Sequence, residues 1–258
     1  MNIYLSRWTC LDVESNLARL REEAAEAVQG GSDWIVFPES FLHGYTRRVE
    51  PARVRQMFLE ISAHHPSAVF FFGSFSEDRR NRMTVWRDGK EAATYDKVHL
   101  FAPNCENALW DAGESYVAVD LGDLKVGLLN CNDLRFPEQA RSLRLKGGVR
   151  ALVAVAWWPW RRTHIWETLL RARAIENGVW VFGCCVAGSR HPGEDFAGAG
   201  NYVFDPAGEA VRTPDDRTYE AGLSAAPKLL VEPSDPFVDI SEVVVYGAGE
   251  GPAGRGSL

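Results

Sequence analysis

Three reactive side chains stand at the same kind of position in the sequence, directly after a short apolar run. Such runs end at the carboxylic acid Glu39, at the amine Lys97 and at the thiol Cys131. In α/β proteins, strand ends are where ligands bind and where catalytic groups gather. A thiol and a carboxylate at these ends could act as nucleophile and base.

Cys131 differs from the other cysteines because it stands between a predicted strand and a predicted helix start. Backbone N–H groups and the helix dipole at such a position favour a thiolate. The N–H of the next residue, Asn132, could donate to an oxyanion, as at other strand-to-helix turns. The alternative is a buried structural cysteine. We expect that role for the remaining cysteines, which are Cys10, Cys105, Cys184 and Cys185.

Glu39 and Lys97 each have a structural and a chemical interpretation. Apolar neighbours such as Phe37 and Phe41 would partly bury the Glu39 carboxylate and make it a usable base near neutral pH. A carboxylate at a strand end is otherwise a solvated or capping residue. Lys97, judged by its own spacing, is a surface lysine paired with Asp96.

Composition and charge exclude several classes of protein. The 258 residues are 46% hydrophobic and 24% charged, as in an ordinary globular protein. A net charge of −7 argues against nucleic-acid binding, which needs a basic surface. Five cysteines without a Cys-x-x-Cys and six scattered histidines predict neither a disulfide framework nor a metal site. No apolar run approaches the roughly 18 residues of a membrane span, and the first residues do not resemble a signal peptide, so we expect no membrane association and a cytoplasmic location.

The elements that must position these residues alternate between helices and strands. The strands are apolar throughout, as expected when both faces of a sheet are covered, and hairpins make the sheet mixed. The sequence therefore predicts a single α/β domain over 1–258, with a mobile tail from about Gly249. Predicted helices lie between Asp12 and Gly30 and over 51–63, 137–146 and 163–177; predicted strands lie over 34–37, 68–75, 117–119, 124–129, 151–156 and 179–184, with hairpins turning at Asp88-Gly89, Gly122-Asp123 and 206–208.

The three reactive residues stand in motifs that resemble those of the nitrilase superfamily of carbon–nitrogen hydrolases. Glu39 ends Phe37-Pro38-Glu39, Lys97 lies within 95–101 and Cys131 within 130–138, and the motifs follow one another in the family's order. Residues 166–177 and 205–209 add further similarity, so the resemblance covers the chain to about residue 212.

The resemblance implies a fold and a mechanism. The fold is a nitrilase-type α-β-β-α sandwich with two mixed β-sheets between helical layers. Glu39, Lys97 and Cys131 would form the catalytic triad, with Glu106 assisting. The substrate would be a small-molecule amide, hydrolysed through a thioester without any cofactor, and the protein would be a homodimer or a larger homo-oligomer.

Within the superfamily, 134–138 and the stretch from Trp158 to Trp166 most resemble the ω-amidase-like branch. Those enzymes hydrolyse the terminal amide of dicarboxylic acid monoamides. Asn132 and Trp157 depart from that branch, where Tyr and Asn are usual. The C-terminal part departs as well, because 228–233 lacks the usual ending that helps relatives associate.

Several residues near the implied site have two interpretations. Trp157 and Trp158, with Trp160, either wall a pocket for an apolar or aromatic acyl group or belong to the core or to a subunit contact. Arg162 either binds a substrate carboxylate or is a solvated charge at a helix start, and we expect Arg135 to pair locally with Asp133 or Glu138.

The alternatives for the activity are an N-carbamoyl-amine hydrolase, a nitrilase with the same triad, or a non-enzymatic binding module that has kept it. An intact Glu, Lys and Cys favours an enzyme over the binding module.

Overall fold

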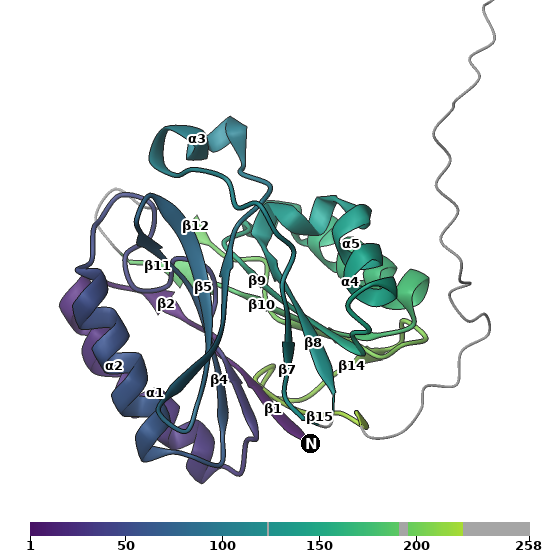
Figure 1. Ribbon diagram of the computed structural model, residues 1–258, viewed down its shortest axis with the longest axis horizontal. Helices are drawn as coiled ribbons and strands as arrows, with labels where there is room; N and C mark the ends of the chain where they lie inside the picture. Colours follow the sequence, from purple (N-terminus) through teal and green to yellow (C-terminus); the bar gives the residue numbers. More distant parts are fainter. Residues whose placement is uncertain (123, 191–195, 224–258) are drawn as a thin grey trace, which may run out of the picture.

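The chain folds as two β-sheets packed face to face, with helices on both outer sides (Figure 1). The computed structural model describes residues 1–122, 124–190 and 196–223. Both sheets are mixed, with parallel strands at the centre and antiparallel strands at the edges. The predicted α-β-β-α sandwich is thereby confirmed.

The first sheet has the strand order β15-β1-β3-β4-β5-β6, and α1 (Val13–Gln29) and α2 (Pro51–His64) cover its outer face (Figure 1). The sheet brings together the runs that end at Glu39 and at Lys97. Its strands are β15 (Thr218–Glu220), β1 (Asn2–Leu5), β3 (Trp34–Val36), β4 (Val69–Glu77), β5 (Arg80–Arg87) and β6 (Lys90–Asp96).

The second sheet has the order β14-β13-β10-β9-β8-β7, with α4 (Pro137–Leu145) and α5 (Thr163–Asn177) on its outer face (Figure 1). Cys131 follows β8. The strands are β14 (Ala210–Val211), β13 (Tyr202–Phe204), β10 (Trp180–Cys185), β9 (Ala151–Ala156), β8 (Lys125–Asn130) and β7 (Ala118–Asp120).

Short elements complete the described chain. A small sheet joins β12 (Phe196–Ala197), β11 (Gly188–Ser189) and β2 (Thr9–Cys10). The short helix α3 (Glu106–Leu109) and three 3-10 turns, η1 (Ala102–Asn104), η2 (Cys131–Arg135) and η3 (Trp160–Arg162), occur outside the sandwich layers. No helix among the described residues is long and apolar enough to cross a membrane.

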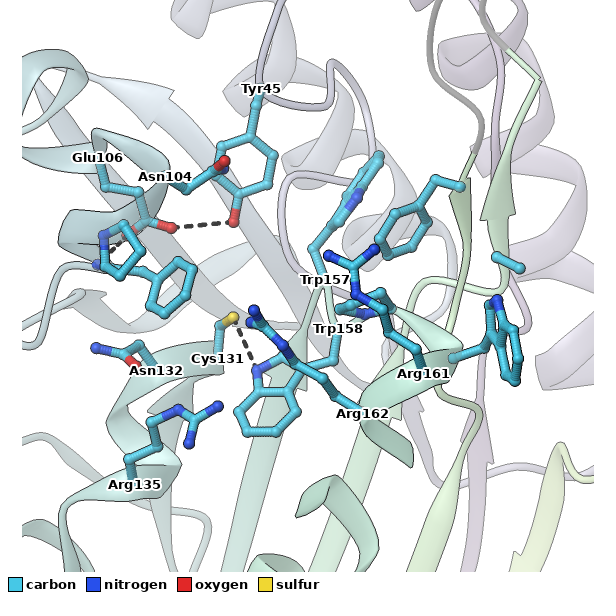
Figure 2. A pocket seen from close by; sticks show the side chains of 16 residues that line it. Tyr45, Asn104, Glu106, Cys131, Asn132, Arg135, Trp157, Trp158, Arg161 and Arg162 are labelled. Atoms are coloured by element: carbon cyan, nitrogen blue, oxygen red, sulfur yellow. Dashed lines mark hydrogen bonds between the residues drawn. The ribbon is translucent and has the colours of Figure 1, made fainter. Parts of the chain in front are cut away.

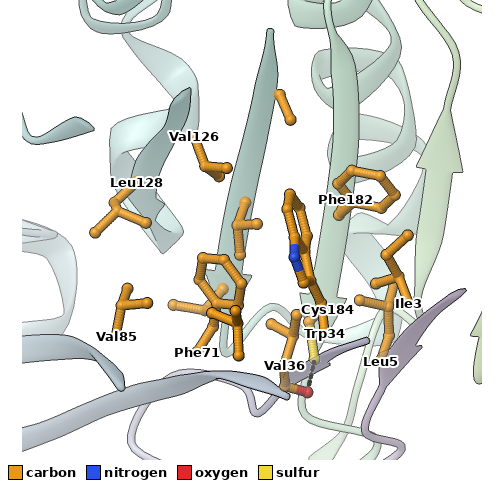
Figure 3. Close-up of a cluster of buried hydrophobic side chains, with 14 of the residues drawn as sticks. Ile3, Leu5, Trp34, Val36, Phe71, Val85, Val126, Leu128, Phe182 and Cys184 are labelled. Atoms are coloured by element: carbon orange, nitrogen blue, oxygen red, sulfur yellow. Dashed lines mark hydrogen bonds between the residues drawn. The ribbon is translucent and has the colours of Figure 1, made fainter. Parts of the chain in front are cut away.

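Strand periodicity explains how one chain fills three apolar layers. In β3, Trp34 and Val36 point into the core between the sheets, and Ile35 points toward α1 and α2. In β9, Val153 faces the same central core and Leu152 faces the α4 and α5 side. Figure 3 shows the side chains of both sheets meeting in the central layer.

Most predicted elements are confirmed. Asp12 caps α1 by accepting a hydrogen bond from the Ser15 N–H, and Asp88 and Gly89 turn the β5–β6 hairpin with positive φ angles. The edge strand β15 and the small sheet carry no clear periodic signal and were not predicted. Asp123, the tail from Gly249 and 228–233 lie outside the described residues.

Candidate active site

A buried ammonium group between two carboxylates forms the centre of the site. Lys97 Nζ lies 2.8 Å from Glu39 Oε1 and 2.9 Å from Glu106 Oε2. Lys97 and Glu39 are 0% exposed, and Glu106 is 1% exposed. The structural interpretation of Lys97 as a surface partner of Asp96 is wrong. Asp96 instead accepts two hydrogen bonds from the Arg82 guanidinium.

The electrostatics of this cluster keep Lys97 charged. Burial alone would lower the pKa of Lys97, but the charges of Glu39, Cys131 and Glu106 outweigh it and raise that pKa. Burial raises the pKa of Glu106, against the lowering effect of Lys97. The site therefore contains a permanent cation beside the cysteine.

Glu39 is held on both carboxylate oxygens. Oε1 accepts hydrogen bonds from Lys97 Nζ and, at 3.0 Å, from Asn81 Nδ2, and Oε2 accepts from the Trp157 backbone N–H at 2.9 Å. Asn130 Nδ2 in turn donates to Asn81 Oδ1 at 3.3 Å. Asn81 is a polar residue on β5 that was not predicted, because only the sheet creates its contacts.

Cys131 is the first residue of η2, directly after β8, and it has the left-handed backbone angle φ = 55°. A non-glycine residue in this region carries strain, which functional sites often retain. The side chain is 7% exposed, and its Sγ accepts a hydrogen bond from Trp158 Nε1 at 3.1 Å. The turn aims the sulfur away from the apolar core between the sheets.

The thiol of Cys131 is a poorer acid than an ordinary cysteine. Burial raises its pKa well above the usual value, and Glu39 raises it further; Lys97 lowers it only in part. The expectation that a helix start favours the thiolate is therefore wrong. The element after Cys131 is a short 3-10 turn, and burial beside two carboxylates outweighs its N–H groups.

Asn132 connects the cysteine turn to the segment after Lys97. Its side-chain Nδ2 donates to the backbone carbonyls of His99 at 3.1 Å and Leu100 at 3.3 Å. Asp133 adds to this link by accepting from the His99 N–H at 2.9 Å. As the second residue of η2, Asn132 has a backbone N–H without a carbonyl partner inside the turn, so this N–H can serve a substrate oxygen.

A cavity of about 660 Å³ opens beside the Cys131 sulfur (Figure 2). Its wall includes six of the predicted site residues, whereas Glu39 and Lys97 are buried outside its lining. The six are Glu106, Cys131, Asn132, Trp157, Trp158 and Arg162. Tyr45, which donates to Glu106 Oε1 at 3.1 Å, also lines the cavity and was missed because it lies in a loop without a motif.

The tryptophan cluster belongs to this wall. Trp157 packs against Tyr45 and Phe196, Trp158 against Trp166, and Trp160 lies on the rim with 67% of its surface exposed. All three tryptophans thus line the cavity, and their role in binding a substrate stays a prediction. Trp158 additionally packs into the apolar layer under α5.

The predicted local ion pair of Arg135 is wrong. Its guanidinium instead lies over the Trp158 ring, 4.5 Å from the ring centroid, because Asp133 is engaged by Tyr95 and His99. Arg162 extends over Phe101 at 5.6 Å. Both guanidinium groups point into the cavity, as Figure 2 shows.

Comparisons with known proteins agree on one family. The sequence profile described as Carbon-nitrogen hydrolase matches residues 1–226. The chain is 33% identical over 193 residues to the omega-amidase YafV of Escherichia coli K12, which covers 72% of this chain and 73% of YafV. It is 32% identical over 191 residues to the 2-oxoglutaramate amidase of Bacillus subtilis 168, which covers 70% and 73% of the two chains.

A solved structure extends the agreement to the fold. Nit3 of Saccharomyces cerevisiae, a member of branch 10 of the nitrilase superfamily, superposes with a TM-score of 0.71 at 26% identity, over 82% of this chain and 84% of Nit3. Sequence and fold thus point to one enzyme family, and the resemblance read from the motifs is confirmed. The profile match spans all the described residues, and this chain therefore belongs to the carbon-nitrogen hydrolase family, within the nitrilase superfamily.

Proposed function

We propose that the protein is an amidase that hydrolyses a small amide carrying a carboxylate, through a thioester on Cys131. The names of the relatives, an omega-amidase and a 2-oxoglutaramate amidase, support this substrate class. The proposal rests on one observation: a cavity lined by arginines opens beside Cys131. The charges of Glu39 and Lys97 act on the thiol of that cysteine.

In the proposed acylation, Glu39 takes the thiol proton of Cys131 as the sulfur attacks the amide carbonyl. A base is required because burial and the neighbouring carboxylates raise the pKa of this thiol. The Lys97 ammonium and the Asn132 N–H stabilise the oxyanion, a role in which one donor is worth about 2.7–4 kcal/mol of barrier. The C–N bond then breaks, and ammonia leaves with the proton from Glu39.

In the proposed deacylation, Glu39 takes a proton from water, and the water oxygen attacks the thioester. The C–S bond then breaks, and the Cys131 sulfur takes that proton from Glu39, which restores the thiol and the carboxylate. Glu106 pairs with the Lys97 ammonium as Glu39 does, and so helps to keep the cation in place through both steps. The carboxylic acid product then leaves through the cavity.

The carboxylate of the substrate is inferred from three arginines. Arg135, Arg161 and Arg162 line the cavity, and none forms an ion pair with a carboxylate in the part of the chain that the structure describes. Burial and the neighbouring Arg162 lower the pKa of Arg135, so two like charges face each other at the wall. A bound carboxylate would relieve that repulsion and accept charge-assisted hydrogen bonds.

A matched pair of amides tests the proposal. Succinamate and butanamide have the same chain length and differ by one carboxylate. We expect kcat/KM for ammonia release to be about tenfold to a hundredfold higher for succinamate, since a hydrogen bond to a charged group is worth about 1.5–3 kcal/mol. Arg162→Gln should remove most of this preference and leave the rate on butanamide within threefold.

Arg212→Gln, a change at an exposed arginine outside the cavity lining, is the matched control and should keep the preference. Cys131→Ala should abolish ammonia release from both amides, and the intact enzyme should carry an acyl mass on the Cys131 peptide during turnover. Equal kcat/KM for the two amides would refute a carboxylate subsite. Turnover by Cys131→Ala would place the nucleophile elsewhere.

A further inference from the structure

The Cys131 sulfur has a side-chain hydrogen-bond donor that the mechanism above does not use. Trp158 Nε1 lies 3.1 Å from Sγ, and the two side chains are 4% and 7% exposed (Figure 2). An indole N–H is a donor only, so the sulfur must be the acceptor. A hydrogen bond to sulfur is strongest when the sulfur carries a negative charge.

The position of the Trp158 ring is fixed on several sides. Its backbone N–H donates to Cys185 Sγ at 3.3 Å, and its ring packs against Trp166 with centroids 5.5 Å apart. The Arg135 guanidinium lies over the ring, 4.5 Å from the ring centroid. The indole N–H therefore stays directed at the sulfur without further reorganisation. Such preorganised donors are the ones that lower barriers.

The surroundings of the sulfur make a donor there valuable. A thiolate at Cys131 is opposed by burial and by the negative charges of Glu39 and Glu106, and it is favoured by the Lys97 charge and by a hydrogen bond from the Trp157 backbone N–H. Arg135 also attracts the thiolate. The charged and titratable groups that act on this sulfur are Glu39, Tyr45, Lys97, Glu106 and Arg135.

We propose that Trp158 is a catalytic residue that donates its indole N–H to the Cys131 sulfur whenever that sulfur is anionic. The inference rests on the proposed function, in which Cys131 is the nucleophile. In acylation the N–H stabilises the thiolate that forms as Glu39 takes the proton. In deacylation the C–S bond breaks, its electron pair returns to sulfur, and the same N–H receives the leaving thiolate.

This role differs from that of an aromatic wall residue. A ring that only bounds the cavity would affect KM and substrate choice, and any ring of similar size would serve. A donor to sulfur changes the reactivity of the thiol even when no substrate is present. The pH profile of thiol alkylation separates the two roles.

The test compares the parent protein with Trp158→Phe, which keeps an aromatic ring and removes the N–H. Iodoacetamide is added between pH 6 and pH 11, and alkylation is followed on the Cys131 peptide by mass spectrometry, so that the exposed Cys105 does not interfere. We expect the alkylation midpoint of Cys131 to rise by about one pH unit or more, which corresponds to about 1.4 kcal/mol. The kcat for amide hydrolysis should fall about tenfold, with KM changed less than threefold.

Trp166→Phe is the matched control. Trp166 contacts the Trp158 ring but donates its own N–H to the Gly200 carbonyl at 3.0 Å. Its replacement should leave the alkylation midpoint within about 0.3 pH units of the parent, a change that is small beside the shift of about one unit expected for Trp158→Phe.

If Trp158→Phe does not fold, the analogue 3-benzothienylalanine at position 158 replaces the indole N–H with sulfur at nearly constant shape and should give the same shift. An unshifted midpoint with either replacement would overturn the role of Trp158. Failure of the proposed function is seen separately, as a parent enzyme that forms no acyl adduct on Cys131 with any amide.

Discussion

Cys131 keeps its proton at neutral pH because burial and the carboxylates of Glu39 and Glu106 raise the pKa of its thiol. In the unfolded chain the same thiol has an ordinary pKa of about 8.5. Above that pH the unfolded chain has lost the thiol proton while the folded chain still holds it. The free energy of unfolding therefore falls as the pH rises toward the folded pKa. Below the pKa of the unfolded chain, the contribution of this thiol to stability is complete.

The thiol thus predicts a pH dependence of stability. Between about pH 8.5 and the raised folded pKa, the free energy of unfolding should fall by up to about 1.4 kcal/mol per pH unit more in the parent than in Cys131→Ala. Urea unfolding at pH 7.5, 9 and 10 measures the two slopes, and the buried Cys184 and Cys185 cancel because both proteins contain them. Cys105→Ala controls for the loss of an exposed thiol, and parallel slopes for the parent and Cys131→Ala would contradict the prediction.

Single residues differ in how far their sequence position reveals them. Cys131 and Glu39 could be selected because each ends an apolar run, a local feature that the sheets preserve. Lys97 also follows such a run, but its burial could not be predicted from its spacing, since its partners Glu39 and Glu106 reach it only through the fold. Arg135 was misjudged for the same reason: its neighbour in space is the Trp158 ring, which follows another strand.

At the scale of elements, the segment between β6 and β7 carries both Lys97 and Glu106 and returns to its starting point at Gly113. The Gly113 N–H donates to the Lys97 carbonyl at 2.8 Å. A Cβ added at Gly113 would lie 2.1 Å from the carbonyl oxygen of Asp96, the residue directly before Lys97. The backbone that carries Lys97 would therefore have to shift. The packing of this return therefore positions the cation.

Gly113→Ala should consequently lower both stability and activity. We expect a loss of about 1–3 kcal/mol in the free energy of unfolding and at least a tenfold fall in kcat, because small displacements of catalytic groups are costly. Gly222→Ala is the control, since a Cβ there meets open space, and it should change stability by no more than about 0.5 kcal/mol. Chemical denaturation measures the free energy of unfolding of both variants, and ammonia release on the same preparations measures kcat. If the two variants behave alike, the segment between β6 and β7 does not position Lys97.

Elements were predictable where a local pattern repeats. The α5 and β9 boundaries agree with the predicted ranges, because apolar periodicity and terminal glycines define them. The turn η2 was not predicted, since Pro137 marks the start of α4 but nothing in the sequence distinguishes the 3-10 turn before it. That turn is where the thiolate expectation failed.

At the scale of the whole molecule, the site is divided between the two sheets. Glu39 and Lys97 come from the first sheet, and Cys131 and Trp158 follow strands of the second. The distance between the two halves is therefore set by the central apolar layer shown in Figure 3. Packing between the sheets should matter for catalysis in a way that packing under the helices does not.

Two consecutive phenylalanines of β4 allow this to be tested. Phe71 and Phe70 are both 0% exposed, but Phe71 packs in the central layer against Trp34 and Phe70 packs on the helix side against Phe72. Phe71→Leu and Phe70→Leu should each reduce the free energy of unfolding by about 1–2 kcal/mol, because each leaves a similar defect in a close-packed layer. Only Phe71→Leu should lower kcat, by at least threefold, since only its layer separates the two halves of the site. Equal stability loss with equal kcat in the two variants would mean that the sheets hold their spacing without this contact, and that the site depends on the strand ends alone.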